Sequence, residues 1–160
     1  MTVGVGEKIT AADILAISIR AGYPVPKTAQ ETVNNSEVMQ NDDELLLAVG
    51  ANEDWVLEVL LLYRYDILTS QGTDIAWAVP AGGAITEVGT PVVENAAEVD
   101  ATAVLTLDGG AGADYYYKTT YRYVGAGAAG NIQLTWAQHT AHASDNHIEE
   151  GSYILAHRLL

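Results

Sequence analysis

Three histidines and three acids gather in one short stretch near the end of the 160-residue chain. They are His139, His142, His147, Asp145, Glu149 and Glu150. Imidazole and carboxylate groups together are the ligands that zinc and similar divalent ions take in proteins. The spacing does not make a site by itself, because no helical pattern places His139 and His142 on one face. We interpret the stretch as a solvated connection between two strands; at a subunit interface its histidines would make assembly sensitive to pH.

A second set of oxygen ligands is the run Asn41, Asp42, Asp43 and Glu44. Carboxylate and amide oxygens suit calcium, but the run lacks the spaced pattern of a helix-loop-helix calcium site. Asn and Asp side chains also bond their own backbone in turns, and this is the interpretation that we prefer. We therefore expect no resident metal at either stretch.

A glycine-rich run, GAGAAG at residues 125–130, contains the G-x-G-x-x-G spacing of dinucleotide-binding loops. That motif needs a helix after it, whereas here a strand pattern follows at Ile132. We interpret the run as a loop and expect no cofactor. No G-x-S-x-G motif is present, and the paired carboxylates of a glycosidase would meet only in the fold. We predict that the chain is not an enzyme.

The composition argues against several classes of function. The chain has no Cys, which excludes disulfides, thiolate metal sites and cysteine nucleophiles. Its formal net charge of -14, from 21 acidic and 7 basic residues, repels nucleic acid. The sequence shows neither a secretory signal pattern nor an apolar run long enough to cross a membrane. We expect a soluble protein that is assembled in the cytoplasm and binds neither nucleic acid nor membrane.

The C-terminal stretch, residues 131–160, holds two runs of alternating side chains. In the first run Ile132, Leu134 and Trp136 share one face of a strand, because strand side chains alternate with period two. One face of the second run carries Tyr153, Leu155, His157 and Leu159. We predict that the two runs form a hairpin that closes the fold, with the final strand paired inside a sheet.

The same period-two pattern predicts two longer strands. Residues 55–65 place on one face Trp55, Leu57, Val59, Leu61, Tyr63 and Tyr65. Val56, Leu60 and Leu62 lie on the opposite face, so we expect this strand to be covered on both sides or to meet a second subunit. Residues 115–124 place on one face Tyr115, Tyr117, Thr119, Tyr121 and Tyr123.

Shorter strands are predicted at residues 28–33 and 37–40, which we expect to pair as a hairpin, and at 44–49, 74–79 and 101–107. Turns are expected at residues 41–43, 50–54 and 80–83, and residues 84–100 resemble an irregular surface excursion. The total is roughly eight to ten short strands, a number typical of a sandwich or jelly roll. The predicted fold class is mainly β, an antiparallel β-sandwich of jelly-roll-like type.

A short helix is predicted before the strands, over residues 10–21, with Thr10 as its N-cap and Gly22 ending it. Ile14 and Ile17 share its apolar stripe. Two prolines at residues 23–26 then favour a stiff, extended connector. We divide the chain into an N-terminal helix and arm, residues 1–27, and a β-sandwich domain, residues 28–160. The helix is too short to be stable alone, so the arm should dock on a sandwich or on another subunit.

Two parts of the chain resemble a known group of proteins. One part is W-A-Q-H-T at residues 136–140, followed by a polar stretch and by G-S-Y-I-L-A-H-R at residues 151–158. The other part, residues 28–63, has a Q-N-D-D-E-L step into an apolar strand and an A-N-x-x-W turn. These stretches are similar to the small structural proteins of tailed bacteriophages, which include capsid decoration, minor capsid and fibre proteins.

The resemblance implies a virion protein of β-sandwich type and brings no catalytic residues with it. We expect a capsid decoration or minor capsid protein on the head surface, homotrimeric and bound to the major capsid protein. The alternative is a tail-fibre or head-fibre module that binds host-surface carbohydrate. The residues predicted to form interfaces are Ile14, Ile17, Tyr23, Trp55, Tyr63, Tyr115, Tyr117, Tyr121 and Trp136.

Overall fold

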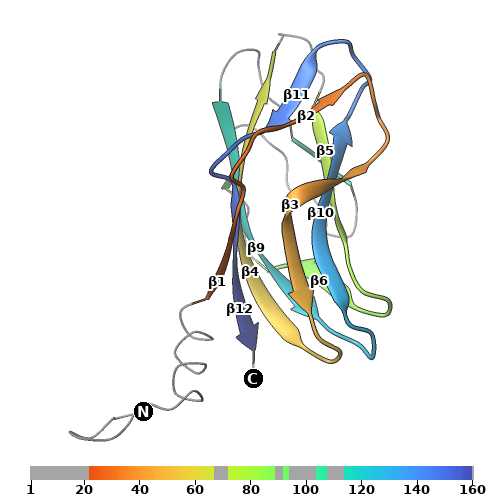
Figure 1. The fold of residues 1–160 in the computed structure, drawn as a ribbon, viewed down its shortest axis with the longest axis vertical. Helices are drawn as coiled ribbons and strands as arrows, with labels where there is room; N and C mark the ends of the chain where they lie inside the picture. Colours follow the sequence, from red (N-terminus) through yellow and green to blue (C-terminus); the bar gives the residue numbers. More distant parts are fainter. Residues whose placement is uncertain (1–21, 67–71, 89–91, 94–103, 108–113, 160) are drawn as a thin grey trace, which may run out of the picture.

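The computed structural model describes residues 22–66, 72–88, 92–93, 104–107 and 114–159 (Figure 1). These residues form two antiparallel sheets and contain no helix. The predicted class, a mainly β antiparallel sandwich, is therefore confirmed. The helix predicted over residues 10–21, with Ile14 and Ile17, lies outside the described residues.

The larger of the two sheets, called here the large sheet, has eight strands. They are β1 (Tyr23–Pro26), β2 (Glu31–Asn34), β4 (Asp54–Tyr65), β6 (Ala84–Glu87), β7 (Val92–Val93), β9 (Asp114–Val124), β11 (Asp145–Ile148) and β12 (Tyr153–Leu159). The small sheet has four strands. They are β3 (Gln40–Val49), β5 (Thr73–Ala78), β8 (Leu105–Leu107) and β10 (Gly130–Gln138).

In the large sheet some short strands lie end to end and together occupy one strand position, called here a row. β11 and β12 both pair with the same edge of β4. On their other side β11 pairs with β2, and β12 pairs with β1. β6 and β7 likewise both pair with β9. The rows of the large sheet therefore follow the order β1/β2, β11/β12, β4, β9, β6/β7, and the small sheet has the order β3, β10, β5, β8. Along the chain, every connection between rows crosses from one sheet to the other.

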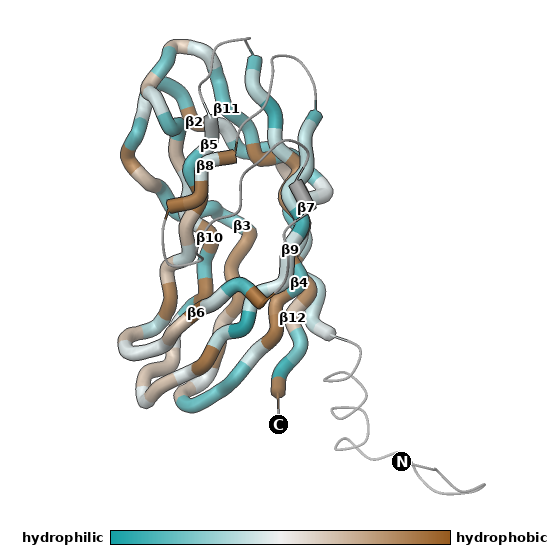
Figure 2. The backbone as a smooth tube through the Cα atoms, turned by 180° about the vertical axis from the view of Figure 1, so that it is seen from behind, coloured by the Kyte–Doolittle hydropathy of each residue, from teal (hydrophilic) through white to brown (hydrophobic). Residues whose placement is uncertain are grey.

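The core lies between the sheets because each strand turns one face inward. On β4 the buried set is one of the two apolar faces predicted from the sequence, from Trp55 to Tyr65 at every second position. Ile132, Leu134 and Trp136 of β10 face it from the small sheet with no exposed surface. Figure 2 shows the resulting alternation of hydrophobic and hydrophilic residues along the strands. Full burial of one such side chain contributes about 1.5–3 kcal/mol.

The predicted strands at residues 55–65, 115–124 and 132–136 are confirmed, and burial alternates along each of them as the pattern predicted. The chain also ends on a strand paired inside a sheet, since β12 lies between β1 and β4. The predicted turns at residues 50–54 and 80–83 are confirmed as connections between strands, except that Asp54 already begins β4. The strand predicted at residues 101–107 is described only from residue 104, and it is β8.

Four predictions of local structure are wrong, two of them about strand pairing. The two C-terminal runs are not a hairpin, because β10 belongs to the small sheet and β12 to the large sheet. Residues 28–40 are not a hairpin either, because β2 pairs with β11. Residues 41–43 are part of β3 and not a turn, and the supposed excursion at residues 84–100 contains β6 and β7. Alternation identifies a strand, but only the assembled sheets choose its neighbour.

The predicted border between the N-terminal arm and the sandwich lies after residue 27, but the first row of the large sheet begins before that border. Tyr23–Pro26 is strand β1, paired with β12. The Lys27 amide donates to the Ser152 carbonyl at 2.8 Å, and Lys27 as a whole is only 2% exposed. Residues 23–27, which the sequence placed in the arm, therefore belong to the sandwich.

The glycine-rich run after β9 is a loop, as predicted, and it packs closely on the turn between β3 and β4. The Asn52 amide donates to the Ala126 carbonyl at 2.7 Å, and the Gly125 amide donates to Asp54 Oδ1 at 3.2 Å. A Cβ added to Gly125 would lie 2.3 Å from the carbonyl oxygen of Glu53, whereas one added to Gly127 would have nothing within 4 Å. Gly125 is therefore required for backbone contact between two turns.

We expect Gly125→Ala to lower the free energy of unfolding by about 1–3 kcal/mol, because backbone atoms must move apart to admit the methyl group. Urea unfolding followed by tryptophan fluorescence measures the change. Gly127→Ala, two residues further on in the same loop, is the control and should change stability by less than about 1 kcal/mol. Equal losses in both variants would contradict the close approach at Gly125.

Candidate functional site

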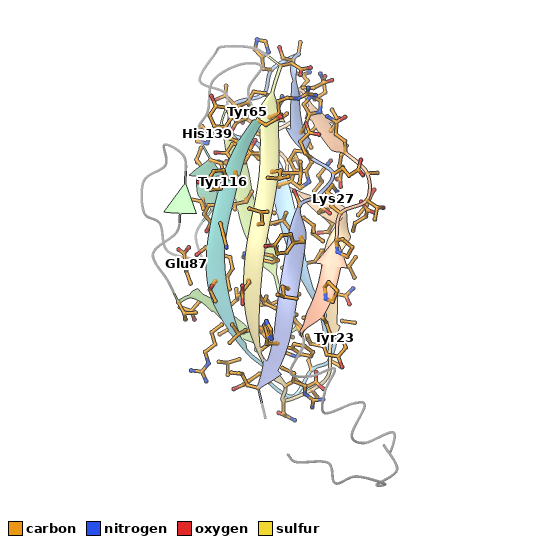
Figure 3. All side chains as sticks on the ribbon, turned by 90° about the vertical axis from the view of Figure 1, so that its left-hand side faces the viewer. Tyr23, Lys27, Tyr65, Glu87, Tyr116 and His139 are labelled. Carbon is orange, nitrogen blue, oxygen red and sulfur yellow. The ribbon has the colours of Figure 1, made fainter. Side chains whose placement is uncertain are left out.

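The solvent side of the large sheet, called here the outer face, carries a group of apolar side chains. Figure 3 views this face, with β9, β4, β12 and β1 side by side. Its apolar side chains are Pro24, Pro26, Val56, Leu60, Leu62, Tyr116, Tyr153 and Leu155, all half-buried or exposed. The strand register makes them neighbours, since Leu60 lies opposite Tyr153 and Leu62 lies opposite Tyr116. Contiguous apolar surface of this kind marks an interaction site.

Three of the seven basic residues of this acidic chain lie on the outer face. Arg64, Lys118 and Arg122 all point outward from β4 and β9, and Arg122 Nη2 lies 3.5 Å from Asp54 Oδ2. Arg64 Nε lies 3.2 Å from Glu149 Oε1. Asp54 and Glu149 thus have nearby cations on this face, whereas the whole chain carries a formal charge of -14. A second acidic protein meets less repulsion here than the overall charge implies.

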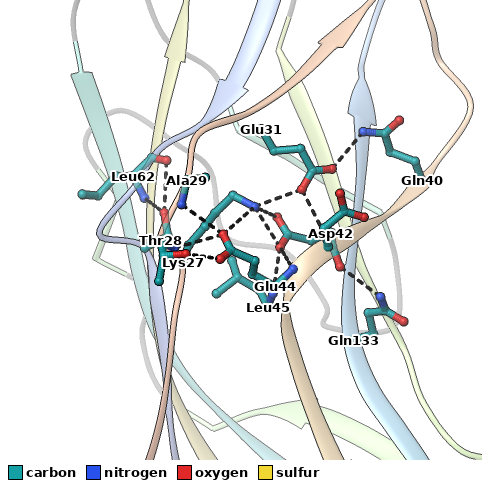
Figure 4. Close-up of polar contacts among 12 residues, drawn as sticks. Lys27, Thr28, Ala29, Glu31, Gln40, Asp42, Glu44, Leu45, Leu62 and Gln133 are labelled. Carbon is teal, nitrogen blue, oxygen red and sulfur yellow. Dashed lines mark hydrogen bonds and ion pairs between the residues drawn. The ribbon is translucent and has the colours of Figure 1, made fainter.

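A buried ion cluster fixes the edge of this face (Figure 4). Lys27 Nζ donates to both oxygens of Asp42, at 3.0 and 2.9 Å, and to Glu31 Oε2 at 2.9 Å. Asp42 has no exposed surface, and its Oδ1 also accepts from the backbone amides of Glu44 and Leu45. The cluster lies between β1 and β2 and ties this row of the large sheet to β3 of the small sheet.

Electrostatics within the cluster favour the charged forms. Burial by itself lowers the pKa of the Lys27 ammonium, but the hydrogen bonds and charges of Asp42 and Glu31 outweigh burial, so the pKa is raised above 10.5. The Thr28 hydroxyl, with the backbone amides of Ala29 and Thr28, lowers the pKa of Glu44. Lys27 is therefore a fixed cation and has no free lone pair for base or nucleophile chemistry.

The structure does not bring His139, His142 and His147 together. His139 is exposed, with Nδ1 at 3.0 Å from Asp74 Oδ1. His142 Nδ1 accepts from the Ser144 amide at 2.9 Å. His147 is buried in β11, where it contacts Thr32 and Asp66. Each of the three rings contacts a different set of partners. The three histidines therefore do not form together the metal site considered in the sequence analysis.

Residues 41–44, considered in the sequence analysis as possible calcium ligands, have carboxylates that bind groups of the chain itself. The carboxylate of Asp42 is fully engaged by Lys27 and two backbone amides. Glu44 accepts from the Thr28 hydroxyl and from the amides of Thr28 and Ala29. These carboxylates therefore hold the chain's own groups.

A second polar cluster, which the sequence analysis missed, lies under the edge strand β6. The Tyr117 hydroxyl donates to Glu87 Oε1 at 3.0 Å and lies 2.7 Å from the Tyr121 hydroxyl. The Thr119 hydroxyl also donates to Glu87 Oε1, at 2.5 Å. The alternation of tyrosines predicted their shared face, but it did not indicate that Glu87 would come from a segment expected to be irregular.

The residues predicted to form interfaces lie mostly inside one chain. Trp55, Tyr63, Tyr117, Tyr121 and Trp136 are at most 6% exposed and face the core. Tyr23 and Tyr115 are half-buried and pack on that core, with ring centroids 5.8 Å from Trp55 and 5.7 Å from Tyr63. The aromatic pattern therefore located the core.

Comparison with known proteins adds no relative: no family model, no curated protein and no solved structure matches this chain. Within the part of the chain that the structure describes, no helix is long and apolar enough to cross a membrane.

Replacing the buried cation should destabilise the fold strongly. We expect Lys27→Met to lower the free energy of unfolding by about 3–5 kcal/mol, because Asp42 would keep a buried charge without its partner. Urea unfolding at neutral pH measures the loss. The exposed Lys118 gives the matched control, since Lys118→Met should change stability by less than about 0.5 kcal/mol. Similar values for the two variants would show that the ion cluster contributes little.

Alkaline pH should weaken the fold through buried tyrosines. Burial raises the pKa of Tyr117 and of Tyr121, so both keep their protons in the folded state above their ordinary value of 10.0. A folded pKa raised above the unfolded one gives stability that is complete below the unfolded pKa of about 10 and is lost as the pH rises from there through the folded pKa. Urea unfolding between about pH 8 and pH 11 should show a falling free energy above pH 10. A flat profile, or complete titration of the tyrosines in the folded protein, would contradict this expectation.

Proposed function

We propose that this chain is a non-enzymatic structural protein of a tailed-bacteriophage virion, a capsid decoration or minor capsid protein that binds the outside of the head. The observation that carries the proposal is the order of strands in the two sheets. The apolar outer face and the sequence resemblance described above support it independently.

The strand order supports a jelly roll as the finer classification of the sandwich. Numbered along the chain, the rows of the large sheet follow the order 1-9-3-7-5 and those of the small sheet 2-8-4-6. The row β6/β7 is an additional row at the edge of the large sheet. When it is omitted and the remaining eight rows are renumbered along the chain, the orders become 1-8-3-6 and 2-7-4-5, which are those of the eight-stranded jelly roll. That architecture recurs in viral capsid domains and in lectins. A fold alone does not define a function, so the surface must supply the rest of the argument.

The outer face supports a partner on the head. Its apolar side chains and compensated charges suit contact with the major capsid protein and with further copies of this chain in a homotrimer. A protein that binds only the assembled shell stabilises that shell by its binding free energy. The proposed mechanism is therefore added interface across neighbouring capsid subunits, without chemistry.

The second candidate is a fibre module that binds host-surface carbohydrate. Jelly rolls include lectins, and the exposed ring of Tyr116, 38% accessible, could stack on a sugar. Immunogold labelling of intact virions with an antibody against this chain separates the two candidates. Label over the head supports decoration, whereas label at the tail tip supports the fibre module and makes glycan binding the next measurement.

A charge placed on the outer face should prevent head binding. We expect Leu60→Glu to reduce cosedimentation with heads stripped of this protein at least tenfold, because a carboxylate would be desolvated in the contact. The melting temperature should stay close to wild type, because Leu60 points away from the core. The control is Ala48→Glu, on the exposed side of β3 in the opposite sheet. Unchanged binding by Leu60→Glu would show that another face makes the contact.

A further inference from the structure

Two carboxylates lie directly opposite each other where β4 ends beside β11. The pairing of Asn146 with Tyr65 places the next pair, Asp145 and Asp66, across from one another. The Asp66 amide donates to the Asp145 carbonyl at 3.2 Å, which extends the ladder by this pair. Like charges opposite each other in a sheet destabilise it. The position therefore favours a cation between the two side chains.

A buried imidazole completes this cluster. His147 is two residues from Asp145 on the same strand, so both side chains project from the outer face. One ligand atom from each of Asp66, Asp145 and His147 can be chosen so that all lie within 4.8 Å of one another. His147 is only 5% exposed, and its Nε2 lies 3.1 Å from Asp66 Oδ1.

The neighbouring strand β2 holds two of these groups in place. The Thr32 hydroxyl lies 3.0 Å from His147 Nδ1, and Asn34 Nδ2 donates to Asp145 Oδ1 at 2.6 Å. Partners of this kind orient metal ligands and fix the imidazole tautomer. In one imidazole tautomer the Thr32 hydroxyl donates to Nδ1, and Nε2 donates to Asp66 Oδ1 at 3.1 Å. In the other tautomer Nδ1 donates to the Thr32 hydroxyl and the Nε2 lone pair faces Asp66, and this is the form that can bind a metal ion together with the carboxylates.

We propose that Asp66, Asp145 and His147 form a binding site for a divalent transition-metal ion of the zinc type. One imidazole nitrogen and two carboxylate oxygens are a ligand set that Zn²⁺ accepts, with one further position for water or for a ligand from a partner. Ca²⁺ is a poorer match, because it takes six to eight oxygen ligands. This site differs from the histidine trio suggested by the sequence, and it revises the expectation that the chain has no metal.

The nearest competing cation is Arg64. Its Nη2 lies 3.8 Å from Asp66 Oδ1, beyond a direct hydrogen bond, while its Nε lies 3.2 Å from Glu149 Oε1. Arg64 can therefore stay paired with Glu149 when a metal ion occupies the space between the two aspartates. The site is independent of the proposed virion function, since it rests only on contacts within one chain.

The test is isothermal titration of the chelator-treated full-length protein with ZnCl₂, and in parallel with CaCl₂. We expect one equivalent of Zn²⁺ to bind with micromolar affinity, at least tenfold more tightly than Ca²⁺, and to raise the melting temperature by about 5 °C at saturation. Asp66→Asn and Asp145→Asn should each weaken Zn²⁺ binding at least tenfold. Without metal both variants should fold, because each removes one of two repelling charges.

The double variant His139→Gln/His142→Gln is the matched control, because it removes the more exposed imidazoles of the same region. It should keep wild-type Zn²⁺ affinity. The proposal is overturned if the wild-type protein binds no Zn²⁺, if both aspartate variants bind it like wild type, or if the control loses binding. The imidazole NMR signals of His147 give a readout without mutation, and they should be the ones that shift when Zn²⁺ is added.

Discussion

The structure depends on keeping one lysine cation buried between carboxylates. Lys27 lies where the first row of the large sheet is interrupted, and Asp42 reaches it from the first strand of the small sheet. A buried ion pair gains little over an apolar pair, but losing one partner leaves an uncompensated charge inside the protein. The cluster therefore specifies which segments meet at this edge. It explains why a run of four polar residues, 41–44, can form a strand at the sandwich edge.

Polar side chains also cross between the sheets elsewhere. Tyr65 of β4 donates its hydroxyl to the Leu107 carbonyl on β8, and Asn146 of β11 donates to the Thr73 hydroxyl on β5 at 3.0 Å. The chain has nine Tyr and no Phe. Buried tyrosine hydroxyls need hydrogen-bond partners, and Tyr65 and Tyr117 find them in Leu107 and Glu87. These directed contacts complement the non-directional packing of Leu, Ile and Val and help fix how the two sheets align.

The two proposals use different parts of one surface. The apolar side chains around Leu60 lie along the middle of the outer face, and Asp66, Asp145 and His147 lie at the end of the same face where β4 meets β11. A metal ion there would have an open coordination position beside a surface proposed to contact other subunits.

The sequence by itself determined which segments are strands and which of their faces are apolar, because period-two alternation is a local property of extended backbone. It gave residues 55–65 with Leu57 and Leu61 on one face and Leu60 and Leu62 on the other. Only the tertiary structure decided which face met the small sheet, that β10 and β12 would separate, and that Lys27 would be buried against Asp42. It also brought Asp66 to Asp145 across 79 positions of sequence. Pairing between distant strands depends on the complementarity of whole surfaces and buried charges, which no local pattern contains.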